Sequence, residues 1–227
     1  MEQGGILLVS LAKGLLGEET SRLLGAFLVA RIWQTAMARA ARPQSSRSDF
    51  SLYLDEFQNY LHLPQSLEDV LVEARGYRLG LVLANQHLGQ LASATREALA
   101  ANARTRVVFQ CGQEDARYLA REFSPWLGDL QLLNLQPHQV AVRQIRDGRT
   151  ERPFTGITRP EPPSLGAAHA AALTASALAR CGRPRADVES EIEQRLMAYD
   201  SEAADRKQVA SASDGGRSRG RSRGRRP

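Results

Sequence analysis

The sequence predicts an α/β fold built around a parallel sheet. Short apolar runs of strand length alternate along the chain with longer segments that have helical periodicity. The connections between them are short, which is typical of strand–helix–strand units. Two of the apolar runs end in polar residues, Asp55-Glu56 and Asn85-Gln86, as expected where active residues gather at the carboxyl ends of parallel strands.

The first part of the sheet is expected within residues 5–77. Its elements, in chain order, are a strand at 5–10, a helix from 18 or 20 to about 41, a strand at 50–54 and a helix from 66 to about 77. The run Gly5-Ile-Leu-Leu-Val-Ser10 is almost wholly apolar, as in a parallel sheet covered on both faces. Pro43 stops the first helix, and Ser66-Leu-Glu-Asp69 resembles a capping box that opens the second.

The second part of the sheet is expected within residues 79–157. Its elements are a strand at 79–84, a helix at 93–102, a strand at 105–111, a helix at 113–123, a turn-rich connector at 132–137 and a hairpin formed by 139–145 and 150–157. Asp147-Gly148 lies between the two hairpin strands and is a strong signal for a tight turn. We expect this hairpin to close one edge of the sheet.

The C-terminal third differs in composition. A Pro-rich linker at 159–166 leads into an Ala-rich helix at 167–179, and Val188, Ile192 and Leu196 have helical spacing within a last helix from 185 to about 207. Ser, Gly and Arg dominate from Ala210 onward, which predicts disorder. The expected divisions are a core at 1–158, a linker with the Ala-rich segment at 159–186, a helix at 187–209 and a disordered Arg-rich tail at 210–227.

The charge of the chain is concentrated in that tail. The formal net charge is +5, and residues 214–227 contain six arginines and one acid, so residues 1–213 are neutral overall. Two interpretations stay open: the tail binds nucleic acid or another acidic surface through phosphate contacts, or it is a solvated, disordered terminus. Cys111 and Cys181 have no metal-ligand spacing and predict reduced thiols in a cytoplasmic protein. No apolar run reaches the roughly 20 residues of a membrane-spanning helix.

The run Phe-Ser-Leu-Tyr-Leu-Asp-Glu-Phe-Gln at 50–58 has the pattern of a Walker B strand. In that pattern Asp55 holds Mg²⁺, usually through water, and Glu56 orients or deprotonates the attacking water. The usual partner motif, the phosphate-binding loop G-x-x-x-x-G-K-[ST], does not occur in this sequence. Lys13 and Lys207 are the only lysines, and neither follows such a loop. The chain therefore reads as the second half of an ATPase core.

An ordered set of motifs carries a family resemblance. The set comprises GILLVSLAKG at 5–14, LGEET at 16–20, LYLDEFQ at 52–58, EARGY at 73–77, LANQHLGQL at 83–91, Asn102, VVF at 107–109 and EDA at 114–116. In this order they resemble the C-terminal half of the RecA-like motor of conjugative type IV coupling ATPases of the TraG/TraD type, in the HerA–FtsK group. The resemblance covers roughly residues 4–158 and implies a partial RecA-like P-loop NTPase sheet.

The resemblance also implies a function. Such motors are hexameric, hydrolyse ATP with Mg²⁺ at subunit interfaces, and move DNA toward a type IV secretion channel with a relaxase as partner. Carried over by motif, Asp55 is the Mg²⁺-side acid, Glu56 the catalytic glutamate and Gln86 the sensor of the γ-phosphate or attacking water. Arg75 is implied to face the nucleotide or a neighbouring subunit. Contact with the inner membrane is expected only through an N-terminal region that this sequence lacks.

Each of these assignments has a simpler alternative. Asp55 and Glu56 could be solvated acids at a strand end, and Arg75 could be a helix C-terminal cation stabilised by the helix dipole. The chain could be a truncated, non-catalytic paralogue that acts as an interaction or DNA-binding module. A protein-translocating ATPase or a HerA-like DNA-processing motor would present the same motifs.

Overall fold

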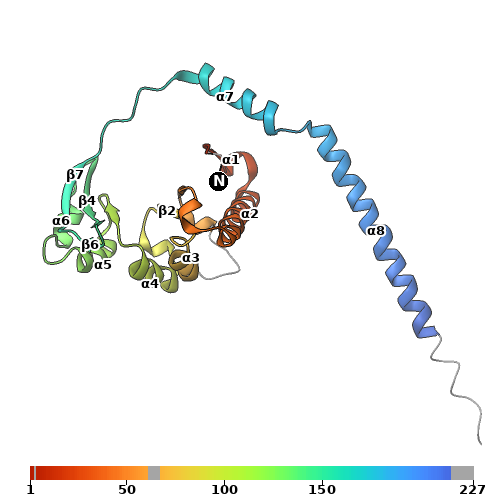
Figure 1. Ribbon diagram of the computed structural model, residues 1–227, viewed down its shortest axis with the longest axis horizontal. Coiled ribbons are helices and arrows are strands. Elements are labelled where there is room, and N and C mark those ends of the chain that lie inside the picture. Colours follow the sequence, from red (N-terminus) through yellow and green to blue (C-terminus); the bar gives the residue numbers. More distant parts are fainter. Residues whose placement is uncertain (3, 61–66, 216–227) are drawn as a thin grey trace, which may run out of the picture. The chain divides into compact units, whose positions relative to one another are not determined.

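The computed structural model describes residues 1–2, 4–60 and 67–215 (Figure 1). The chain divides into two compact units, residues 1–160 and 161–227, and each is described by itself. Within the described residues, none of the helices has the length and apolarity needed to cross a membrane. The first unit contains both helices and a parallel strand pair, so the predicted α/β class is confirmed.

The parallel strand pair lies in the first half of unit 1. The elements there are α1 (Lys13–Leu16), α2 (Glu18–Met37), the short helices η1 (Ala38–Ala41), η2 (Gln44–Ser46) and η3 (Phe57–Asn59), the strands β1 (Phe50–Leu54) and β2 (Leu79–Leu83), and α3 (Leu67–Glu73). The strands pair in parallel, with Phe50 opposite Leu79 and Leu54 opposite Leu83. The bounds of β1 agree with the prediction, and those of β2 differ by one residue.

One face of this strand pair is covered and the other is not. Alternate residues point to opposite faces of a strand, so Phe50 and Leu79 lie on the side that packs against α2 and α3. The buried cluster on this side consists of Trp33, Ala36, Val70, Ala74 and Leu79. On the other side, Tyr53 is 72% exposed and Val82 is 47% exposed. Within the described residues this strand pair is therefore covered on one face.

The predicted strand at 5–10 is not present. This segment has neither helix nor strand structure, and Ile6 and Leu8 are 91% and 86% exposed. Apolarity suits a strand, but a strand forms only when a neighbour accepts its backbone hydrogen bonds. Within the described residues β1 pairs with β2 alone, so residues 5–10 have no ladder.

The second half of unit 1 forms a separate antiparallel sheet. Its elements are η4 (Leu88–Gln90), α4 (Ser93–Asn102), β3 (Arg106–Val108), α5 (Gln113–Phe123), α6 (Asp129–Leu133), β4 (Gln139–Arg143), β5 (Ile145–Arg146), β6 (Arg149–Thr150) and β7 (Phe154–Ile157). β4 lies between β3 and β7 and is antiparallel to both. α5 and α6 supply its core through Leu119, Phe123 and Leu132. The hairpin predicted around Asp147-Gly148 is confirmed.

The pairing of β3 departs from the prediction of a single parallel sheet. β3 spans three residues rather than 105–111, and it pairs with β4 in antiparallel orientation. Arg106 and Arg143 are direct neighbours in this pairing, and like charges at such positions repel. Glu122 of α5 offsets the repulsion, because its Oε2 lies 2.6 Å from Arg106 Nε and 3.7 Å from Arg143 Nη1. This local arrangement favours the antiparallel partner.

Several helix boundaries also differ from the sequence expectation. α3 ends at Glu73 rather than near Tyr77, because Gly76 and a left-handed Arg78 (φ 54°) turn the chain into β2. Part of the expected connector at 132–137 belongs to α6. The proposed capping residue Ser66 lies outside the described residues.

Unit 2 contains α7 (Gly166–Cys181) and α8 (Arg185–Gly215), which confirm the two helices expected there. α8 continues through residues 210–215, for which disorder was expected. Ile192 and Leu196 are 52% and 60% exposed, so their helical spacing does not bury them within the chain. The arginines of the tail lie outside the described residues.

Candidate functional site

The site lies where β1 and β2 end. Leu54 and Leu83, the last residues of the two strands, are direct partners, so both strands end at the same level. The Ala84 N–H donates to the Leu54 carbonyl at 2.9 Å, and the Phe57 N–H donates to the Ala84 carbonyl at 3.2 Å. The residues that follow each strand are therefore held next to each other by backbone bonds, as the parallel pattern predicted.

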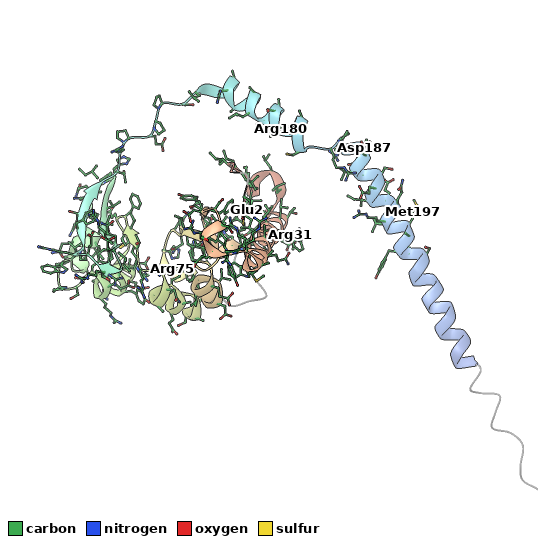
Figure 2. The ribbon with its side chains drawn as sticks, viewed as in Figure 1. Glu2, Arg31, Arg75, Arg180, Asp187 and Met197 are labelled. Carbon is green, nitrogen blue, oxygen red and sulfur yellow. The ribbon has the colours of Figure 1, made fainter. Side chains whose placement is uncertain are left out.

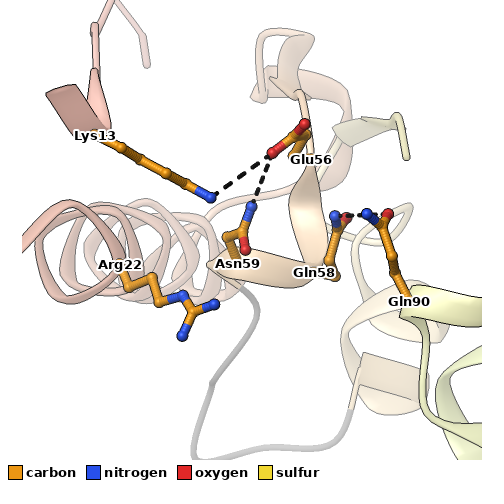
Figure 3. A pocket seen from close by; sticks show the side chains of 6 residues that line it. All are labelled: Lys13, Arg22, Glu56, Gln58, Asn59 and Gln90. Carbon is orange, nitrogen blue, oxygen red and sulfur yellow. Dashed lines mark hydrogen bonds and ion pairs between the residues drawn. The ribbon is translucent and has the colours of Figure 1, made fainter. Parts of the chain in front are cut away.

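Glu56 is the centre of this group. Its backbone is left-handed (φ 46°, ψ 48°), which costs a non-glycine residue about 1–2 kcal/mol and turns the chain directly into η3. Gln86 Nε2 donates to Glu56 Oε1 at 2.7 Å, and Asn59 Nδ2 donates to Glu56 Oε2 at 3.2 Å. Lys13 Nζ lies 4.0 Å from the same Oε2 (Figure 3). The structure thus brings together Glu56 and Gln86, which the sequence had placed one strand apart.

Asp55 precedes Glu56 and is exposed. Its Oδ1 accepts the Glu56 N–H at 3.0 Å, and the carboxylate has no other hydrogen bond or ion pair with the residues that the structure describes. Mg²⁺ prefers oxygen ligands and usually keeps several waters, bound through one or two carboxylates together with phosphates. Asp55 fits such a role because an oxygen stays available to a hydrated ion. No cluster of three or more metal-ligating side chains occurs among the described residues.

A polar pocket of about 420 Å³ opens beside Glu56 (Figure 3). Its lining residues come from α1, α2, β1's C-terminal turn, η3 and η4, and all are polar: Lys13, Arg22, Glu56, Gln58, Asn59 and Gln90. The sequence analysis selected Glu56 alone among these six. One signal was available for Lys13, since it is one of two lysines in a chain rich in arginine. Gln58 and Gln90 lie within the motifs at 52–58 and 83–91 and Asn59 follows the first of them, but the sequence assigned no role to any of the three amides.

Arg75 is not part of this group. It is exposed and lies in the turn between α3 and β2, where its carbonyl accepts the Arg78 N–H at 3.1 Å (Figure 2). This turn leads into the start of β2, whereas Glu56 follows the end of β1. The two residues therefore lie at opposite ends of the parallel strands. Asn102, another motif residue, donates to the Ala98 carbonyl within α4.

Comparison with known families identifies one segment. Residues 49–140 match the family described as the TraM recognition site of TraD and TraG. The match begins just before β1 and ends in β4, so it contains Asp55, Glu56 and Gln86. It confirms the resemblance to TraG/TraD-type proteins within this segment. No curated protein sequence matches the chain.

Solved structures with partial likeness include a bacterial conjugative coupling protein and a viral packaging enzyme. The coupling protein TrwB, in a form named TrwBdeltaN70, is 18% identical, with a TM-score of 0.43 over 53% of this chain and 34% of that chain. The genome packaging NTPase B204 from Sulfolobus turreted icosahedral virus 2, in complex with AMPPCP, is 14% identical, with a TM-score of 0.39 over 59% of this chain and 63% of that chain. The chain thus spans about a third of the first protein and less than two thirds of the second.

Proposed function

We propose that this chain is part of an ATP-driven motor that moves DNA during conjugative transfer, of the TraG/TraD coupling type. The observation that supports the proposal best is the contact of Gln86 with Glu56 at the ends of two parallel strands, inside the segment that matches the TraG/TraD family. A coupled carboxylate and amide at this position suit hydrolysis of the terminal phosphoanhydride bond of ATP by water.

In this proposal each residue has one role. Asp55 supplies a carboxylate oxygen to hydrated Mg²⁺, and bound ATP supplies the phosphate to be transferred. Glu56 accepts a hydrogen bond from the attacking water and takes its proton. Gln86 cannot take a proton; by donating to Glu56 Oε1 it fixes the direction of the carboxylate. The family resemblance gives the Gln86 amide the further role of sensing the γ-phosphate.

Arg75 is proposed to act on a neighbouring subunit. Within its own chain it lies at the far end of the strands from Glu56, so an action on the same site would require a large rearrangement. In a ring, which the resemblance implies is hexameric, an exposed arginine at this end can reach a neighbour's nucleotide. Mixing Glu56→Gln subunits with Arg75→Ala subunits tests this: partial recovery of ATP hydrolysis is expected, because some interfaces then combine an intact Glu56 with an intact Arg75.

The assignment of Glu56 is tested by steady-state ATP hydrolysis. The assay uses a polypeptide that contains these residues together with a phosphate-binding loop, as wild type and as Glu56→Gln. We expect turnover to fall by roughly 10²–10⁴-fold, the usual contribution of a general base, while ATP binding is retained. The matched control is Glu161→Gln, which removes an exposed acid between β7 and α7. Retained turnover in Glu56→Gln would show that Glu56 is not the base.

A second candidate function is recognition without catalysis. It is favoured by the description of the matching family as a TraM recognition site, and by the lack of a G-x-x-x-x-G-K-[ST] loop in this sequence. In this case the chain binds an accessory protein such as TraM, or a relaxase, and either assembles with an intact ATPase or acts as an adaptor. Each charge-assisted hydrogen bond from a phosphate-binding loop to a phosphate contributes about 1.5–3 kcal/mol. Because the 227-residue sequence has no such loop, it lacks these bonds, and the chain alone should not hydrolyse ATP.

The two candidates give different results with the purified chain. Binding to a TraM-type partner with no ATP turnover supports recognition. Turnover that disappears in Glu56→Gln would refute it and support the motor. Either function places the chain in the cytoplasm, with contact to the inner membrane only through another region or partner.

A further inference from the structure

The ammonium group of Lys13 is weakly bound by the described residues. Among the described residues its ion pair is with Glu56 Oε2, at the long distance of 4.0 Å, and its side chain is 42% exposed. An ammonium group has three N–H donors, and at this distance the carboxylate satisfies none of them well. Lys13 therefore points a largely unused cation into the polar pocket (Figure 3).

A second cation lines the same pocket. Arg22 of α2 lies 2.8 Å from Glu18 one turn earlier, through Nη2 alone, and its side chain is 50% exposed. Its other guanidinium N–H groups make no hydrogen bond with the described residues. Together with Lys13 it gives the pocket two positive charges against the single carboxylate of Glu56.

The remaining wall of the pocket consists of amides with unused capacity. Gln58 Nε2 donates to Gln90 Oε1 at 3.1 Å, which leaves the Gln90 amide N–H groups without an acceptor among the described residues. Gln58 Oε1 is buried and receives no hydrogen bond from the residues that the structure describes. If the Gln58 side chain turns so that Oε1 faces the pocket, a ligand that combines acceptor oxygens with an O–H group would satisfy both amides, and hydrogen phosphate is such a ligand.

We infer that this pocket is a binding site for a phosphate group, with Lys13 and Arg22 as its cationic ligands and Gln58 and Gln90 as its amide ligands. The inference rests on the proposed function only in the role that it gives to Glu56. Because Lys13 is shared, a bound phosphate competes with Glu56 for the ammonium group. The phosphate group belongs either to a nucleotide or to the backbone of a nucleic acid, which share this chemistry.

The test is a titration of the purified chain with inorganic phosphate at constant ionic strength, followed by NMR signals of the side-chain amides of ¹⁵N-labelled protein. We expect saturable shifts for the Gln58 and Gln90 amides. Lys13→Gln and Arg22→Gln should each raise the dissociation constant by about fivefold, the upper end for a solvent-exposed ion pair. Lys13→Arg, which keeps the charge, should bind nearly as wild type. Glu56→Gln should bind more tightly, because the competing carboxylate is gone.

The matched control is Arg31→Gln. Arg31 is an exposed arginine of the same helix α2, it donates to Gln34 Oε1 at 3.0 Å, and it does not line the pocket (Figure 2). Unchanged binding in this variant supports a defined site. The absence of saturable shifts in wild type, or an equal loss in all three Gln variants at positions 13, 22 and 31, overturns the inference, since equal loss indicates only the overall charge.

Two competition experiments identify the source of the phosphate. Displacement of inorganic phosphate by ATP assigns the site to a nucleotide, and displacement by a short single-stranded DNA assigns it to a nucleic acid backbone. Displacement by neither refutes the assignment to these two ligand classes. None of these measurements depends on ATP hydrolysis, so their failure is distinct from a failure of the role proposed for Glu56.

Discussion

Removal of the Arg39 guanidinium should destabilise unit 1 strongly. Arg39 is 4% exposed and lies in η1, just after α2. Its Nη1 donates to the Tyr77 carbonyl at 2.8 Å and its Nη2 to the Ser48 carbonyl at 2.7 Å. These two carbonyls lie just before β2 and β1. Nε donates to Glu2 Oε1 at 2.6 Å. One buried side chain therefore ties the end of α2 to the starts of both parallel strands.

The magnitude follows from these partners. Arg39→Met keeps the length of the side chain but leaves two carbonyls and a carboxylate without their donor. Leaving a buried acceptor without its donor costs about 1–3 kcal/mol, so the loss of the donor to the Tyr77 and Ser48 carbonyls should lower the unfolding free energy by at least about 2 kcal/mol. Arg42→Met is the control, because Arg42 is 58% exposed and its Nη1 lies 3.9 Å from Glu2 Oε2. The control should lose at most about 1 kcal/mol.

Urea unfolding followed by tryptophan fluorescence measures this difference. Trp33 is 5% exposed and belongs to the cluster that covers β1 and β2, so its emission reports the unfolding of this part. Trp126 is 48% exposed and is replaced by Phe in both variants and the reference. The midpoint should shift without a change in slope. Equal losses in Arg39→Met and Arg42→Met would refute the reasoning.

The same pair predicts a pH dependence. The hydrogen bond from Arg39 lowers the pKa of the Glu2 carboxyl below its usual 4.5, although partial burial opposes this shift. A lowered folded-state pKa means that the stabilisation is present above about pH 4.5 and is lost as the pH falls through the folded-state pKa. The difference in stability between wild type and Arg39→Met should therefore shrink below pH 4.5. A difference that stays constant down to acid unfolding would contradict the linkage.

Two further predictions concern packing and thiol reactivity. A Cβ at Gly25 would clash with the ring of Tyr60, so Gly25→Ala should destabilise by about 1–3 kcal/mol in urea unfolding, whereas Gly14→Ala meets no atom within 4 Å and should not. Gly25→Ala as stable as wild type would show that the tyrosine ring moves freely. Burial raises the pKa of the Cys111 thiol above its usual 9.0, so a thiol reagent at pH 8 should modify the exposed Cys181 first. Faster reaction at Cys111 would contradict its burial.

Local sequence signals were sufficient for most elements of the fold. The bounds of β1, α4 and α5 agree with the sequence expectation, because each combines a clear periodicity with a polar or small residue at its end. The pairing of the strands was harder to predict than their positions, because an apolar run indicates a strand but does not indicate which other strand it pairs with. That is why residues 5–10 were expected as a strand, and why β3 was expected within a parallel sheet rather than antiparallel to β4.

Some contacts of the candidate site could be predicted from the sequence and others could not. The contact between Glu56 and Gln86 could be predicted because the parallel alignment of two strand ends determines it. The approach of Lys13 to Glu56 could not, because it depends on how α1 docks beside η3, across more than forty residues of sequence. Asn59 was missed for a related reason: only the left-handed turn at Glu56 directs its amide back to the carboxylate.

Substitutions at the strand ends and substitution of Lys13 should therefore have different effects. Glu56 and Gln86 lie on strand ends that the fold holds rigidly, so substitutions there should change chemistry more than geometry. Lys13 lies on a four-residue helix in a segment with exposed apolar residues, and its ion pair with Glu56 is long, so within the described part of the chain its side chain can move toward a ligand at little cost. In Lys13→Gln, phosphate binding could be lost while Gln86 still holds the Glu56 carboxylate. This outcome would show that phosphate binding and water activation depend on different segments of the chain. Loss of both together would instead mean that Lys13 is needed to keep the Glu56 carboxylate in place.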